Sequence, residues 1–68
     1  LASSPSNTNT GTINNTGVFD IPNNFLFPNQ GTIANHGVFT INSDLINDGV
    51  FLNTNEFNGS YRGSGSFA

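Results

Sequence analysis

The sequence GTINNTGVF at residues 11–19 recurs twenty residues later as GTIANHGVF at residues 31–39. Ile21 and Ile41 extend the match, and a third, partial copy, LINDGVF at residues 45–51, begins 12 residues after Ile33. Degenerate copies begin at Ile21 and Phe57. The first three copies share the unit Φ-x-Asn-x-Gly-x-Phe, in which Φ is apolar, so the chain is predicted to be built from a short structural repeat.

The repeat keeps one odd/even phase from Ile13 to Phe67. All seven phenylalanines stand at odd positions. Every charged side chain stands at an even position, as does His36: Asp20, Asp44, Asp48, Glu56 and Arg62. Alternate side chains of a β-strand point to opposite faces, so the odd face is predicted to be the inside.

Such a long unbroken phase predicts a particular architecture. Turns in hairpin proteins commonly reset the phase, whereas a chain that winds around one core keeps the same residues inside. We therefore expect an all-β parallel β-solenoid, also called a β-helix, with no helices. The repeat length predicts about three rungs of about 20 residues each, a rung being one full winding of the chain.

The register of the rungs has two interpretations. The twenty-residue identity favours a rung of about 20, while the spacing of 12 indicates that the same unit also serves a second face. Both offsets are even and preserve the phase. A rung of 20 would stack Ile13 on Ile33, Phe19 on Phe39, Ile21 on Ile41 and Phe25 on Leu45.

Asparagine and glycine recur on the inward face. Glycine permits a positive φ or a tight corner. Asn15, Asn35 and Asn47 are predicted to be corner residues or to form ladders of side-chain amides. The alternative is that they are ordinary exposed turn residues.

The chain divides into two parts by composition. Residues 1–10 are polar and turn-rich, which predicts an N-terminal arm or linker. Residues 11–68 are predicted to be the β-solenoid repeat domain. The chain begins at Leu1, which favours a processed or excised piece.

The repeated units, with their Gly-Thr-Ile lead-in, resemble the repeats of bacterial filamentous-haemagglutinin-like and autotransporter-like surface proteins. The resemblance covers residues 11–57. It implies a right-handed parallel β-helix, export to the cell surface and a structural or adhesive role, with no enzymatic residue to transfer. The chains of that family are much longer than 68 residues.

The composition excludes several functions. There is no cysteine, so disulfides are excluded, and the single histidine, His36, excludes a closed Cys/His zinc site. Arg62 is the only basic residue, which argues against nucleic acid as a partner. No stretch predicts a membrane span. We expect no enzyme, no catalytic residue, no metal site and no cofactor.

The sequence predicts a structural subunit or segment of a secreted or cell-surface filament or adhesin. Its partners would be copies of itself, stacked head to tail through uncapped rungs with possible strand addition by the N-terminal arm, or flanking repeats of a longer chain. The alternative functions are a carbohydrate- or ice-binding module, with a surface glycan as a possible partner, and an Asn-rich functional amyloid.

Overall fold

The computed structural model describes residues 8–22 and 27–68. These residues form strands and no helix, which confirms the all-β expectation. The strands are short and separated by tight corners. Their bounds are β1 Thr12–Asn15, β2 Val18–Ile21, β3 Thr32–Asn35, β4 Val38–Ile46, β5 Val50–Asn53, β6 Glu56–Arg62 and β7 Ser66–Phe67.

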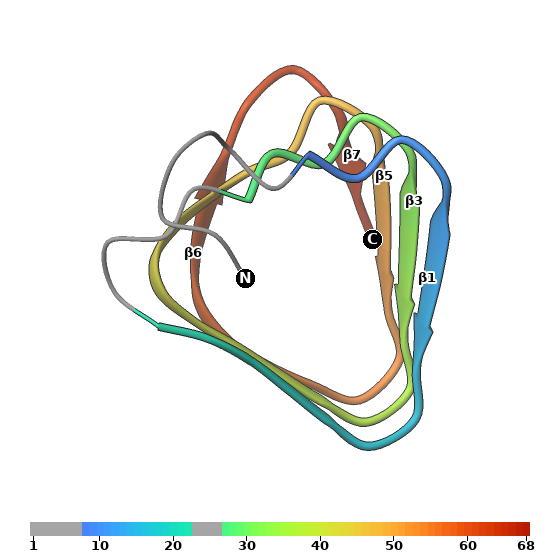
Figure 1. Ribbon diagram of the computed structural model, residues 1–68, viewed down its shortest axis with the longest axis vertical. Helices are drawn as coiled ribbons and strands as arrows, with labels where there is room; N and C mark the ends of the chain where they lie inside the picture. Colours follow the sequence, from blue (N-terminus) through green and yellow to red (C-terminus); the bar gives the residue numbers. More distant parts are fainter. Residues whose placement is uncertain (1–7, 23–26) are drawn as a thin grey trace.

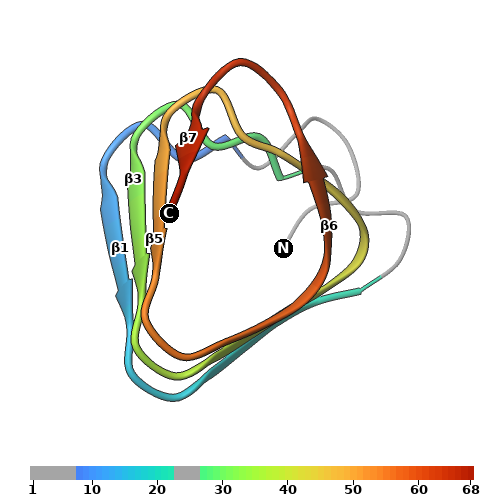
Figure 2. The ribbon, with the colours of Figure 1, turned by 180° about the vertical axis from the view of Figure 1, so that it is seen from behind.

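The strands form two sheets in which every pairing is parallel. One sheet has the order β1-β3-β5-β7 and the other the order β2-β4-β6. Consecutive strands along the chain therefore alternate between the sheets. Figures 1 and 2 show β1, β3, β5 and β7 side by side, with β6 on the opposite side of the molecule. We call residues 11–30, 31–48, 49–64 and 65–68 repeats 1 to 4, each beginning at a glycine.

The pairing register settles how the repeats stack. Thr12 pairs with Thr32, an offset of 20, and Thr32 pairs with Val50, an offset of 18. Val50 pairs with Ser66, an offset of 16. The spacing of about 20 therefore describes only the first step. Three predicted pairs are confirmed: Ile13 with Ile33, Phe19 with Phe39, and Ile21 with Ile41.

The fourth predicted pair was Phe25 with Leu45. Phe25 lies outside the described residues, and Leu45 pairs with Tyr61. The spacing of 12 is not a stacking register, because Ile33 pairs with Phe51. It relates two corners of one repeat, at Asn35 and Asn47, which agrees with the interpretation that one unit serves two faces.

The odd/even phase is confirmed. The buried residues among those described are all odd-numbered: Asn15, Ile21, Phe27, Asn29, Ile33, Asn35, Gly37, Phe39, Ile41, Leu45, Asn47 and Phe51. The five charged side chains and His36 are exposed. Repeats 2 and 3 are each two residues shorter than the repeat before. The irregularity between Thr40 and Asp44 of β4 also shifts the register by two, so the same face stays inside.

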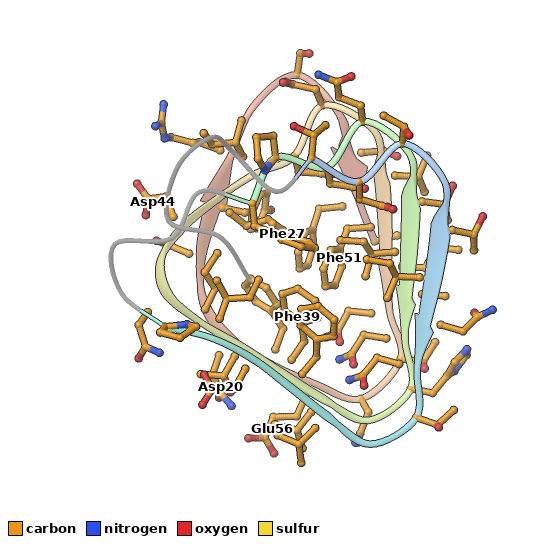
Figure 3. The ribbon with its side chains drawn as sticks, viewed as in Figure 1. Asp20, Phe27, Phe39, Asp44, Phe51 and Glu56 are labelled. Atoms are coloured by element: carbon orange, nitrogen blue, oxygen red, sulfur yellow. The ribbon has the colours of Figure 1, made fainter. Side chains whose placement is uncertain are left out.

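Aromatic and aliphatic side chains fill the space between the sheets. Phe27, Phe39 and Phe51 point inward in Figure 3. The ring of Phe39 stacks on that of Phe19 with a centroid distance of 5.1 Å, and the ring of Phe51 stacks on that of Phe67 at 4.7 Å. Full burial of one such side chain contributes about 1.5–3 kcal/mol, so this column of rings is a main source of stability.

The N-terminal arm is only partly described. Residues 1–7 lie outside the described part of the chain. Asn9, within the predicted arm, forms an isolated parallel bridge with Asn29, which in turn bridges Asn47. Asn9 thus takes part in the same stacking as the later repeats.

Candidate functional site: asparagine and glycine columns

The four acidic side chains are exposed. Figure 3 shows Asp20, Asp44 and Glu56 projecting from the outside of the ribbon, away from the ring of phenylalanines. In residues 8–22 and 27–68, no three His, Cys, Asp or Glu side chains are grouped so that they could hold a metal ion, and there is no pocket.

The exposed polar contacts are local. Arg62 Nε lies 3.7 Å from Asp44 Oδ2, and both side chains are more than half exposed. The Ser60 hydroxyl donates a hydrogen bond to Asp44 Oδ1. An exposed ion pair of this kind contributes at most about 1 kcal/mol. These contacts join the outer faces of the neighbouring strands β4 and β6.

His36 is exposed, as predicted, and has a structural partner. Its Nδ1 lies 2.9 Å from the hydroxyl of Thr54. That hydroxyl also donates a hydrogen bond to the Asn35 carbonyl at 3.0 Å. The histidine therefore links repeats 2 and 3 on the outer surface.

The first asparagine ladder runs along the corner at which the chain leaves β1, β3 and β5, whose last residues are Asn15, Asn35 and Asn53. Asn15 Nδ2 donates to Asn35 Oδ1 at 2.9 Å, and Asn35 Nδ2 donates to Asn53 Oδ1 at 2.8 Å. The same amides reach backbone carbonyls of the next repeat, Val38 at 2.9 Å and Glu56 at 2.7 Å. The ladder thus ties each repeat to the one after it.

The second ladder runs along the corner that precedes each repeat. Asn9 Nδ2 donates to Asn29 Oδ1, and Asn29 Nδ2 donates to Asn47 Oδ1, both at 2.9 Å. Asn47 Nδ2 donates to the Ser66 carbonyl at 2.8 Å. In both ladders the donors point from lower-numbered to higher-numbered repeats.

The predicted ladder role of Asn15, Asn35 and Asn47 is confirmed. The alternative, exposed turn residues, is wrong because their exposures are 8%, 0% and 2%. The structure places them in two ladders. The ladder positions of Asn9, Asn29 and Asn53 were not predicted from the sequence. The available signal was the Asn-x-Gly pair at Asn29 and Gly31, which repeats the corner unit.

The glycines form columns along the same corners. A Cβ built on Gly31 would collide with the carbonyl oxygen of Gly11, and one on Gly49 with that of Gly31. A Cβ on Gly37 would likewise collide with the carbonyl oxygen of Gly17. The backbones approach too closely there for any side chain. This close packing, rather than a positive φ, is what requires glycine at these corners.

Two glycines near the end of the stack have a positive φ. Gly59 has φ 139° and Gly63 has φ 123°. An added Cβ on Gly59 would also meet Ile41 Cγ2 at 2.6 Å. Only at these two positions does the expected conformational role of glycine apply among the described residues.

The asparagine side chains are hydrogen-bonded where they are buried. In the described part of the chain, no buried side-chain nitrogen or oxygen lacks a hydrogen-bond partner. A buried amide without a partner costs about 1–3 kcal/mol. The ladders therefore let polar residues occupy the inward face without this penalty.

Comparisons with protein-family models, with characterised proteins and with solved structures find no match to this chain. Among the described residues, no helix is long and apolar enough to span a membrane.

Proposed function

We propose that this chain is a β-solenoid building block of an extracellular fibre, in which each repeat forms one rung and copies stack end to end. The observation that carries the proposal is the continuity of its columns. Parallel strand pairing, asparagine ladders and stacked rings run in one direction through successive repeats. A stack of this kind extends by adding further equivalent rungs.

Assembly would take place at the edges of the two sheets. β1 and β7 are the outer strands of one sheet, and β2 and β6 are the outer strands of the other. Edge strands present N–H and C=O groups that pair with another chain. A contact between different ends of two copies, if it does not close into a ring, generates a filament.

The extracellular location and the non-enzymatic role rest on composition. Only 7% of the residues are charged, and the chain is rich in Asn, Thr, Gly and Ser and has no lysine. The repeat-level resemblance to filamentous-haemagglutinin-like surface proteins supports the same location.

A glycan- or ice-binding face is less well supported. Such a face would repeat identical outward side chains from rung to rung. The outward column that begins at Thr12 continues as Thr32, Val50 and Ser66, and Asn14 is followed by Ala34 and Leu52. The matching side chains are the inward ones, which favours stacking over surface recognition.

The test is the assembly state of the purified chain. We expect light scattering after size exclusion to show mass that rises with concentration, and electron microscopy to show unbranched filaments. Compact monomers at every attainable concentration would refute the proposal.

A further inference from the structure

Glycines at equivalent corners have very different surroundings. At Gly31, Gly37 and Gly49, an added Cβ would collide with a carbonyl oxygen of the preceding repeat. At Gly11 and Gly17, no described atom lies within 4 Å of the added Cβ. The stacking of the described repeats therefore does not account for glycine at these two positions. A further repeat packed against the outer edge of β1 and β2 would account for it.

Asn15 supplies a second, independent observation at the same edge. Asn15 as a whole residue is 8% exposed. Asn35 Oδ1 and Asn53 Oδ1 each accept from the preceding ladder asparagine, but Asn15 Oδ1 accepts from no group among the described residues. An acceptor oxygen thus stands where the ladder would receive another amide.

The opposite end of this ladder carries the complementary group. Asn35 Nδ2 reaches the next asparagine and the Glu56 carbonyl as well as the Gly37 carbonyl. Asn53 Nδ2 reaches only the Asn55 carbonyl, at 3.2 Å, within the described part of the chain. One end of the ladder therefore offers a donor and the other an acceptor, which permits stacking in a single polarity.

We propose that repeat 1 of one copy docks on repeat 3 of a second copy, in the register that repeat 3 adopts on repeat 2. This inference rests on the proposed function and specifies its junction. In this register, both asparagine ladders, the glycine column and the stacked core side chains continue from one copy into the next. The stacked pairs would be Asn9 on Asn47, Gly11 on Gly49, Ile13 on Phe51, Asn15 on Asn53 and Phe19 on Phe57.

This junction requires β7 to leave. At present Ser66 and Phe67 occupy the edge of β5, paired with Val50 and Phe51. The strand is only two residues long, and Phe67 is partly buried against Phe51 and Tyr61. In the proposed junction β7 is a displaceable strap that competes with the β1 of an incoming copy.

Three full-length variants test the junction, with circular dichroism and size exclusion to verify folding and light scattering to follow assembly. Gly11→Val should fold like the unaltered chain and raise the critical concentration for assembly at least about tenfold, as expected if about 1.4 kcal/mol is lost at the junction. Thr16→Val, at an exposed outward position, is the matched control and should assemble normally. Phe67→Ala should shorten the lag before assembly, because it loosens β7.

The outcomes separate the junction from the proposed function. Normal assembly of Gly11→Val would overturn the junction while leaving fibre formation intact. Slower assembly of Phe67→Ala would show that β7 is part of the contact, which overturns its displacement. If neither the unaltered chain nor Phe67→Ala assembles, both the proposed function and the junction fail.

Discussion

The segments 11–19 and 31–39 differ at only two positions, yet they have different environments. Ile33 and Phe39 are fully buried, whereas Ile13 and Phe19 are partly buried. The later segment has paired strands on both sides, since β3 lies between β1 and β5, and β4 between β2 and β6. Near-identical sequences therefore contribute differently to stability because of their place in the stack.

The largest expected difference between the two segments concerns the phenylalanines. Phe39→Ala should lower the free energy of unfolding by about 3–5 kcal/mol, the usual cost of emptying a fully buried aromatic site. Phe19→Ala should cost about half as much, because less apolar surface leaves water at that position. Urea unfolding followed by circular dichroism measures both. Equal losses would contradict the difference in burial.

The glycine columns give the next largest effect. Gly37→Ala should destabilise the fold by about 1–3 kcal/mol, because its methyl group would collide with the Gly17 carbonyl. Gly17→Ala should change stability by no more than about 0.5 kcal/mol, since no described atom lies near the added carbon. The shift in the urea midpoint reports this. A large loss of stability in monomeric Gly17→Ala would contradict the expected difference between Gly17 and Gly37.

The asparagine ladder predicts a smaller difference. Asn35→Ala should cost about 1–3 kcal/mol, because it leaves Asn15 Nδ2 and Asn53 Oδ1 without their ladder partner. Asn15→Ala should cost less, since it breaks the ladder only at its first member. Thermal unfolding of the two variants provides the measurement. The ladder would lose its assigned role if Asn35→Ala were neutral.

The smallest effect is expected at a position where the segments differ. His36→Thr places in repeat 2 the residue that repeat 1 has at position 16, and it removes the contact with Thr54. The contact is exposed, so the loss should be at most about 1 kcal/mol. Thermal unfolding at neutral pH checks this. A loss comparable with that of Phe39→Ala would mean that the outer surface contributes more than its exposure implies.

Much of this arrangement could be predicted from the order of residues. The odd/even phase identifies the buried face because a strand admits only two directions for its side chains. The twenty-residue identity identifies the pairing of β1 with β3 and of β2 with β4. Asn15, Asn35 and Asn47 could be recognised because an inward polar side chain needs a partner.

The later register could not be predicted in the same way. Repeat 3 lacks the Gly-Thr-Ile lead-in, and its corner has Asn55 where repeats 1 and 2 have glycine. Shortening a repeat by two residues leaves the alternation unchanged, so the phase carries no information about rung length. The motif at residues 45–51 spans the corner that precedes repeat 3. Its spacing of 12 from Ile33 is therefore a distance between two corners of the chain and is not the offset between stacked residues.

Mass per unit length of the assembled filament, from scanning transmission electron microscopy, tests the central claim most directly. A solenoid places about three strand spacings of about 4.8 Å along the axis for each chain. One chain of 7.2 kDa should therefore occupy about 14 Å. An in-register amyloid would place one chain at every strand spacing. We predict about one-third of the amyloid value for a single stack, and a measured density of one chain per strand spacing would contradict the account.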